Sequence, residues 1–325
     1  MLKLHHGTQF EPINAAYNTV FQPNRLSIGL VVPLEAYMTS PVPTMARHVE
    51  RVQLAEQLGF SAVWLRDVPF NEPSFGDAGQ VFDPFVCLGL LAGKTQSIGL
   101  GVASIVLPLR HPAHVAKAAA SVDVLSGGQM LLGVASGDRP EEYPAMALPF
   151  EDRGQRFRDS IAYIRQMAET KATFDSPYGN PNGGMDMLPK PVGGSLHLLI
   201  TGSSQQNQDW LAENGDGWIT YPRNAEQQKR LIADLRARAH ALGQPAKPAM
   251  QSLYIDLVDD PESSPQPIHL GFRSGEKFLV AYLRSLEDAG INHVALNLRF
   301  NRANIEATLQ HLADRVLPEF AAKGH

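Results

Sequence analysis

The sequence predicts an α/β protein built as one (β/α)8 TIM barrel, with an N-terminal extension and a long loop after the seventh strand. Eight short apolar stretches alternate with eight helical stretches in a chain of 325 residues, which is the count of a (β/α)8 barrel. The stretch 98–106 is almost entirely apolar, which indicates a parallel strand buried on both faces. A doubly wound sheet would use the same units, but usually with fewer strands and a recognisable nucleotide-binding turn.

The elements are expected in strict alternation along the chain. The strands are predicted at residues 26–32, 62–66, 98–106, 130–136, 196–201, 217–221, 251–258 and 293–298. The helices are predicted at residues 44–58, 83–93, 113–125, 152–170, 205–214, 225–242, 275–289 and 301–321. A glycine follows four of these helices where a C-cap belongs, at Gly59, Gly215, Gly243 and Gly290. Residues 1–25 then form the N-terminal extension and residues 26–325 a single barrel domain.

Three connections are long enough to suggest a function or mobility: residues 69–80, 172–195 and 259–274. The first and third follow strands, so we expect them on the catalytic face of the barrel. The second precedes the fifth strand and is expected on the opposite face, as a structural or assembly element.

Charge and composition exclude several classes of protein. The net charge of −5 and the pI near 6.1 leave no basic footprint for nucleic acid or an anionic membrane. The one cysteine, Cys87, lies in an apolar helical stretch and is expected in the core. No stretch approaches the ~18 apolar residues of a membrane helix and no signal peptide is evident, so we expect a cytoplasmic protein. His111 and His114 lack the companion carboxylates of a metal site, so no metal is expected.

Polar residues near the carboxyl ends of the predicted strands are the candidates for catalysis. Glu35, Asp67, His111 and Tyr221 follow the first, second, third and sixth strands. In a (β/α)8 barrel this position favours function over stability. For Asp67, a role in hydrogen bonding or an ion pair and a role in acid–base catalysis both stay open. A structural role stays open for the other three.

The turn after the fifth strand has the features of an anion site. Gly202 lets the backbone approach a ligand, Ser203 and Ser204 add hydroxyl groups, and the free N–H groups of a helix start would point outward. Alternatively, Ser203 or Ser204 serves only as an N-cap. Gly99 and Gly101 lie inside a strand and not in a turn, which favours close packing over a dinucleotide-binding fingerprint.

Three segments carry a resemblance to a known family. They read IGLGVASIVLPLRHPAHVAKAAASVDVLSGGQMLLGVASG (98–137), AEQLGFSAVWLRD (55–67) and TGSSQQNQDWLAENGDGW (201–218). Over about residues 25–320, the chain resembles the bacterial luciferase-like flavin monooxygenases, also called LLM-class oxidoreductases. The resemblance implies the barrel fold and a non-prolyl cis peptide bond between Ala103 and Ser104, beside the flavin ring.

The same resemblance implies which residues hold the flavin phosphate: Gly202, Ser203, Ser204, Asn207, Ser136 and Gly137. Bacterial luciferase carries an arginine where Ser136 stands, so Arg139 is the candidate cation. Luciferase also has a histidine where this chain has Val68 and a cysteine where it has Ala135. A luciferase reaction with a long-chain aldehyde is therefore not expected.

The function implied by the resemblance is that of a two-component monooxygenase. Reduced FMN, supplied by a separate NAD(P)H:flavin reductase, would react with O2 to oxygenate a small organic substrate, and the chains would pair as homodimers. The loop 259–274, with His269 and Arg273, is implied to act as a mobile lid. Two alternatives stay open: a deazaflavin-dependent enzyme that transfers hydride, and a flavin-binding relative without catalysis.

Overall fold

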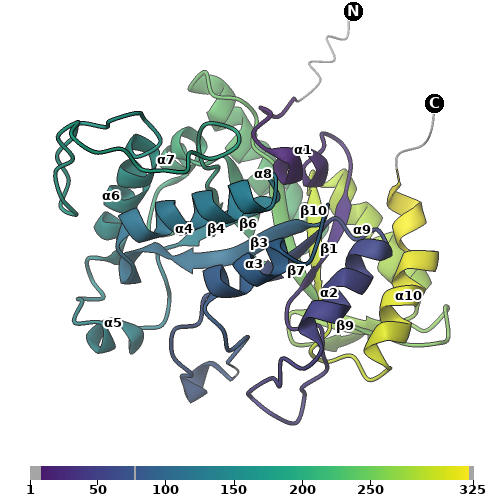
Figure 1. Ribbon diagram of the computed structural model, residues 1–325. Helices are drawn as coiled ribbons and strands as arrows, with labels where there is room; N and C mark the ends of the chain where they lie inside the picture. Colours follow the sequence, from purple (N-terminus) through teal and green to yellow (C-terminus); the bar gives the residue numbers. More distant parts are fainter. Residues whose placement is uncertain (1–8, 77, 322–325) are drawn as a thin grey trace, which may run out of the picture.

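A computed structural model describes residues 9–76 and 78–321 of the chain. Its centre is a closed parallel barrel surrounded by helices (Figure 1). The eight barrel strands are β1 (Ser27–Val31), β2 (Ala62–Leu65), β3 (Gly99–Val106), β4 (Met130–Ala135), β5 (Leu199–Thr201), β6 (Gly217–Thr220), β7 (Ala249–Leu257) and β10 (His293–Asn297). The barrel closes at β10, where His293 lies opposite Ser27 of β1 and Met250 of β7. The predicted (β/α)8 barrel is therefore confirmed.

Helices cover the outside of the barrel in each of the eight predicted stretches. They are α2 (His48–Gln57), α3 (Pro84–Ala92), α4 (Pro112–Leu125), α6 (Arg153–Gln166), α7 (Gln208–Asn214), α8 (Ala225–Ala241), α9 (Glu276–Asp288) and α10 (Ile305–Arg315). Their apolar faces bury residues such as Val52, Leu88 and Phe157 against the sheet in one core. Cys87 of α3 is buried there too, as expected. Among the described helices, none is long and apolar enough to cross a membrane.

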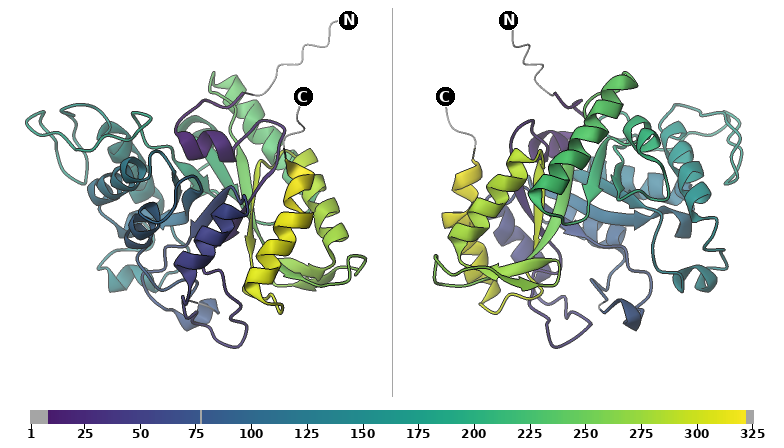
Figure 2. Two further views of the ribbon diagram at one scale, coloured as in Figure 1. Left: turned by 45° about the vertical axis from the view of Figure 1, so that its right-hand side comes forward. Right: turned by 180° about the vertical axis from the view of Figure 1, so that it is seen from behind.

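The described part of the N-terminal extension closes one end of the barrel. Its helix α1 (Ala15–Val20) is capped by Asn14, whose amide also donates to Asp123 and to the Met130 carbonyl, each at 2.8 Å. The Tyr17 hydroxyl donates to the Asp216 carbonyl at 2.6 Å. Met130 begins β4 and Asp216 precedes β6, so α1 lies at the amino ends of the strands. Figures 1 and 2 show it at the end opposite α5 (Glu142–Ala145). Residues 1–8 lie outside the described part of the chain.

The long segment after β7 is a hairpin, which corrects the expectation of a loop. Its strands β8 (Gln266–Ile268) and β9 (Gly271–Ser274) are antiparallel, and β9 pairs in parallel with the outer half of β7. Arg273 lies 3.5 Å from the buried carboxylate of Asp256 on β7. The hairpin lies at the same end of the barrel as α5 (Figure 2). It extends the sheet beyond the barrel, so this segment is anchored by strand pairing.

The segment 172–195 runs along the outside of α4 and α6 and returns to the catalytic face. Lys117 of α4 donates to the Leu188 carbonyl, and the Val192 N–H donates to Asp123 at 2.8 Å. Earlier in the segment, Tyr178 packs on His111, which follows β3. The expectation that the whole segment lies on the opposite face was wrong. Helix α6 carries the chain away from the catalytic face, and the segment then doubles back along α6 toward it. Its contacts fit the expected structural role.

Candidate active site

A pocket of about 380 Å³ opens where five barrel strands end. Its walls come from the carboxyl ends of β2, β3, β4, β5 and β6 and from the short helix α5. The residues of the described chain that line it are Arg66, Asp67, Val68, Ala103, Ser104, Val106, Ala135, Ser136, Gly137, Asp138, Arg139, Glu142, Thr201, Ser203, Ser204, Gln205 and Tyr221. This is the end of a (β/α)8 barrel at which enzymes place their active sites.

The pocket brings together most of the residues expected from the sequence. Those that line it are Asp67, Ala103, Ser104, Ser136, Gly137, Arg139, Ser203, Ser204 and Tyr221. Gly202 lies at its edge, where an added Cβ would come within 3.0 Å of the Tyr221 ring. Glu35, His111 and Asn207 do not line it.

Glu35 and His111, which lie outside the pocket, have structural partners. Both oxygens of the buried Glu35 carboxylate accept hydrogen bonds from Thr44, its N–H at 2.6 Å and its hydroxyl at 2.8 Å. His111 caps α4 by accepting from the Ala113 N–H at 3.2 Å, and its other ring nitrogen lies 3.0 Å from the Tyr178 carbonyl. Because Nδ1 accepts a hydrogen bond, Nε2 carries the hydrogen and donates a hydrogen bond to the Tyr178 carbonyl.

The turn after β5 lines the pocket and contains backbone donors that no acceptor uses in the described chain. The Gly202 N–H is used by the Ile219 carbonyl, and the Gln206 N–H by the Ser203 carbonyl. Within the described chain, the N–H groups of Ser203, Ser204 and Gln205 have no hydrogen-bond partner. These three residues line the pocket. Successive unpaired N–H groups form a concavity of the kind that binds anions.

The helix that follows this turn begins later than the sequence suggests. Its N-cap is Asn207, whose side chain accepts from the Trp210 N–H at 2.8 Å. The expectation that the helix starts at residue 205, and its alternative that Ser203 or Ser204 is the N-cap, were both wrong. Asn207 lies nearest the helix, and its side-chain oxygen satisfies one of the N–H groups of the first helical turn, that of Trp210. The anion-binding features of the turn are therefore those of its backbone.

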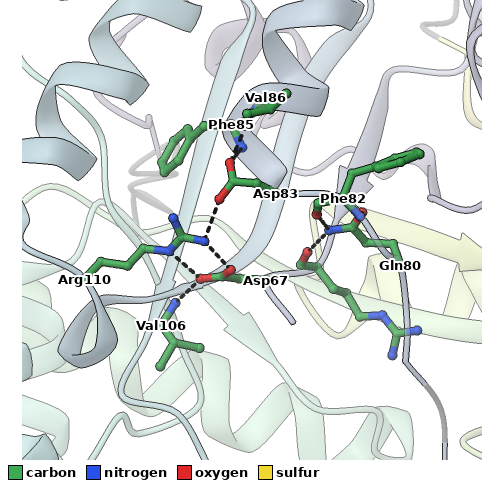
Figure 3. Close-up of polar contacts among 9 residues, drawn as sticks. Asp67, Gln80, Phe82, Asp83, Phe85, Val86, Val106 and Arg110 are labelled. Atoms are coloured by element: carbon green, nitrogen blue, oxygen red, sulfur yellow. Dashed lines mark hydrogen bonds and ion pairs between the residues drawn. The ribbon is translucent and has the colours of Figure 1, made fainter. Parts of the chain in front are cut away.

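An ion pair fixes the position of Asp67 at the end of β2. The Arg110 guanidinium donates to both Asp67 oxygens, Nη2 to Oδ1 at 2.7 Å and Nε to Oδ2 at 3.0 Å. The Val106 N–H also donates to Oδ2 at 3.1 Å, and Arg110 reaches Asp83 at 2.9 Å (Figure 3). Of the two roles left open for Asp67, these contacts support the ion pair.

Arg139 and Glu142 form a buried charged pair in the pocket. Glu142 is only 3% exposed, and its Oε1 has no hydrogen-bond partner in the described chain. Arg139 Nη1 is likewise buried and unpartnered by hydrogen bonds, and the two atoms are 3.8 Å apart. Burial raises the pKa of Glu142 to about 7, although the charge of Arg139 opposes this shift. A carboxyl group with such a pKa can hold or release a proton near neutral pH.

Sequence reasoning missed Glu142. It lies in the charged run DRPEE directly after β4, which looks like a solvated loop. The position of that run at the carboxyl end of a strand was the available signal. In the structure, α5 begins at the last residue of this run, Glu142, whose side chain is buried, while Glu141 stays exposed.

The inner wall of the pocket has the backbone geometry expected from the resemblance. The peptide bond between Ala103 and Ser104 is cis. The Ser104 hydroxyl contacts the hydroxyl of Thr201 across the barrel. Earlier in β3, a Cβ on Gly101 would lie 2.4 Å from the Trp64 ring, so this glycine permits close packing. The reading of these glycines as packing positions is thus supported.

These residues fit a flavin-type cofactor with a phosphate group. Three unpartnered N–H groups and the unpartnered Nη1 of Arg139 are donors that an anion would satisfy. Gly137 has φ of +76°, and a Cβ there would lie 2.7 Å from Val106, so this position of the pocket wall requires glycine. Among the described residues, no cluster of His, Cys, Asp and Glu could hold a metal ion.

Comparison with known proteins identifies the family. The sequence profile of the luciferase-like monooxygenases matches residues 25–264. The chain belongs to this family. The match includes the strands β1 to β7 and every residue that lines the pocket. The luciferase-like barrel therefore contains the whole candidate site.

The relatives and structural neighbours of this luciferase-like protein carry names that specify different reactions. An F420-dependent hydroxymycolic acid dehydrogenase from Mycobacterium tuberculosis is 29% identical over 231 residues, which are 68% of this chain and 60% of that protein. An F420-dependent secondary alcohol dehydrogenase, solved with an F420–acetone adduct, has a TM-score of 0.75 at 17% identity over 92% of this chain and all of that one. The monooxygenase RslO1 from Streptomyces bottropensis has a TM-score of 0.74 at 18% identity over 91% of this chain and all of that one. The two structural matches share the fold.

Proposed function

We propose that this chain is the oxygenase of a two-component system that uses reduced FMN and O2 to oxygenate a small organic substrate. The observation that carries the proposal is the set of donors at one pocket: the unpartnered N–H groups of Ser203, Ser204 and Gln205, together with Arg139 Nη1, which makes no hydrogen bond in the described chain and lies 3.8 Å from Glu142. These donors suit a single phosphate group. Ala103, Ser104, Ser136 and Gly137 would form the wall against which the cofactor lies.

Reduced FMN would supply two electrons, so that one oxygen atom of O2 enters the substrate and the other leaves as water. The residues of the chain bind and orient the cofactor and exclude solvent. Glu142, with its pKa near 7, can hold the proton that such a reaction consumes. The chain carries no evident nicotinamide-binding motif, so we infer that a separate NAD(P)H:flavin reductase provides the reduced cofactor. We also propose that the enzyme works as a homodimer in the cytoplasm.

A deazaflavin-dependent enzyme that transfers hydride is the second candidate. It is favoured by the relatives whose names specify F420, above all the dehydrogenase at 29% identity. The pocket favours FMN, because its lining in the described chain offers no basic side chain beyond Arg66 and Arg139 to an anionic tail that extends beyond the phosphate.

Anaerobic fluorescence titration of the purified protein with reduced FMN and with reduced F420 tests the proposal. We expect reduced FMN to bind at least about tenfold more tightly, a difference of about 1.4 kcal/mol. A preference for F420 would replace oxygenation with hydride transfer. Binding of neither cofactor would remove the phosphate site and the assignment. Substrate turnover with either cofactor would dispose of a non-catalytic role.

A further inference from the structure

A second cavity adjoins the candidate active site and differs from it in chemistry. It has a volume of about 410 Å³ and shares Asp67 and Val68 with the first pocket. Its walls come from the segment after β2, the start of α3, the segment after β3 and the end of α5. Seven of its ten described lining residues are apolar, among them Val68, Pro69, Val81, Phe82, Leu109 and Met146. The first pocket, by contrast, is lined mainly by polar groups and backbone.

The three charged residues of this second cavity pair with one another. Arg110 binds both oxygens of Asp67 and, at 2.9 Å, the Oδ2 of Asp83. The remaining oxygen of Asp83 accepts from the N–H groups of Phe85 and Val86 at 2.9 and 3.1 Å, as the cap of α3 (Figure 3). Every carboxylate oxygen of the two aspartates therefore already has at least one donor.

The net charge of this cluster also disfavours an anion. Two carboxylates face one guanidinium, which leaves one negative charge beside the cavity. Described basic residues other than Arg110 do not line this cavity. An anionic substrate would be repelled, whereas an uncharged molecule would not.

The rim of the cavity exposes large apolar side chains that a ligand would cover. Val81 is 46% exposed, Phe82 44% and Met146 39%. Val81 and Phe82 come from the segment after β2 and Met146 from the end of α5, so the rim has two sides. Removing this apolar surface from water is favourable, and it is the usual source of affinity in small-molecule pockets.

We infer that this second cavity binds the apolar part of the substrate, and that the substrate class is an uncharged, largely apolar organic molecule. Its reacting group would pass the shared edge at Asp67 and Val68 into the first pocket. That the bound molecule is a substrate rests on the proposed function. That the second cavity binds an apolar molecule does not, because it is argued from this cavity alone.

Calorimetric titration with 1-octanol and with octanoate, at about pH 8, tests the inference with two probes of equal chain length. We expect 1-octanol to bind at least about tenfold more tightly than octanoate. Met146→Asp and Val81→Asp should each weaken 1-octanol binding by about tenfold, because each places a charge at the apolar rim. Met185→Asp is the matched control, since Met185 is 75% exposed and lines neither cavity.

Three outcomes would overturn the inference: octanoate binding as tightly as 1-octanol, 1-octanol binding that neither rim variant weakens, or absence of 1-octanol binding. Sedimentation of the variants identifies the competing occupant, a second copy of the chain. If Met146→Asp separates a dimer and leaves 1-octanol binding unchanged, the rim is a contact between copies. FMN titration of the same samples keeps the two proposals apart. Normal 1-octanol binding without FMN binding would contradict the proposed function and leave the cavity assignment standing.

Discussion

Arg110 holds Asp67 through two parallel hydrogen bonds of 2.7 and 3.0 Å, and Asp67 lies just beyond the carboxyl end of β2, the second strand of the barrel. The Asp67 side chain is 1% exposed, and the Val106 N–H donates a further hydrogen bond to Oδ2. The pair joins the carboxyl end of β2 to the segment after β3. It therefore sets the shape of the wall that the two cavities share.

Arg110→Gln is expected to destabilise the protein by about 3 kcal/mol, because the buried Asp67 carboxylate loses its charged partner. Urea denaturation measures this change. Asp83→Asn is the control, since it keeps the Asp67 pair and the α3 cap and should cost less than about 1 kcal/mol. Equal losses in the two variants would show that the Asp67 pair has no special weight.

Glu142→Gln is expected to alter how stability depends on pH. Burial raises the pKa of Glu142 from 4.5 to about 7 in the folded protein. Between these pH values the unfolded chain releases a proton that the folded chain keeps, so stability falls as the pH rises. The glutamine variant lacks this loss, and its melting temperature should exceed that of the wild type at about pH 8 and match it near pH 4. Glu141→Gln, at an exposed position, should show no such pH-dependent difference in melting temperature from the wild type.

Gly202→Val is expected to weaken FMN binding by about tenfold or more. Gly202 has φ of +57°, and an added Cβ would come within 3.0 Å of the Tyr221 ring. The substitution therefore displaces the turn that presents the N–H groups. Gly243→Val is the matched control for backbone strain, because Gly243 has φ of +70° and open space around its Cβ position. Equal FMN affinity in both variants would exclude the turn from the cofactor site.

Two buried histidines are expected to make the protein sensitive to acid. Burial lowers the pKa of His197 to about 4 and of His293 to about 3. His293 accepts from the Trp64 Nε1–H at 2.8 Å and stays neutral in the folded barrel. Below about pH 6.5 the two histidines are protonated in the unfolded chain but not in the folded chain. The free energy of unfolding therefore falls by about 1.4 kcal/mol for each histidine and for each unit by which the pH is lowered.

Chemical denaturation between about pH 7 and pH 5 measures this slope. His293→Gln should reduce the slope, whereas replacing the exposed His240 by asparagine should leave it unchanged. A slope that is the same in the wild type and in His293→Gln would contradict the assignment to the buried ring.

The barrel could be predicted because each strand and helix is encoded locally, by apolar runs and by glycines at helix ends. The exact start of α7 could not, because Ser203, Ser204 and Asn207 are all good capping residues and only the packed turn selects Asn207. The hairpin after β7 was also missed. Its sequence is rich in proline and charge, and β9 becomes a strand by pairing with Tyr254–Leu257.

The candidate site was predicted where motifs are continuous in the chain and missed where burial decides. The residues 103–104, 136–137 and 202–204 lie on three neighbouring strand ends, so the topology alone brings them together. Glu142 needs α5 and the cover of the segment after β2 before its carboxyl is buried. Arg139 shows the same dependence, since its guanidinium lies 4.7 Å from the ring of Phe75.

The most direct test of the central claim compares the affinity of the protein for FMN with its affinity for riboflavin, which lacks the phosphate. If the N–H groups of residues 203–205 and Arg139 bind the phosphate, FMN should bind at least about tenfold more tightly, and Gly202→Val should abolish most of the difference. Equal affinities for FMN and riboflavin in the wild-type protein would contradict the phosphate site.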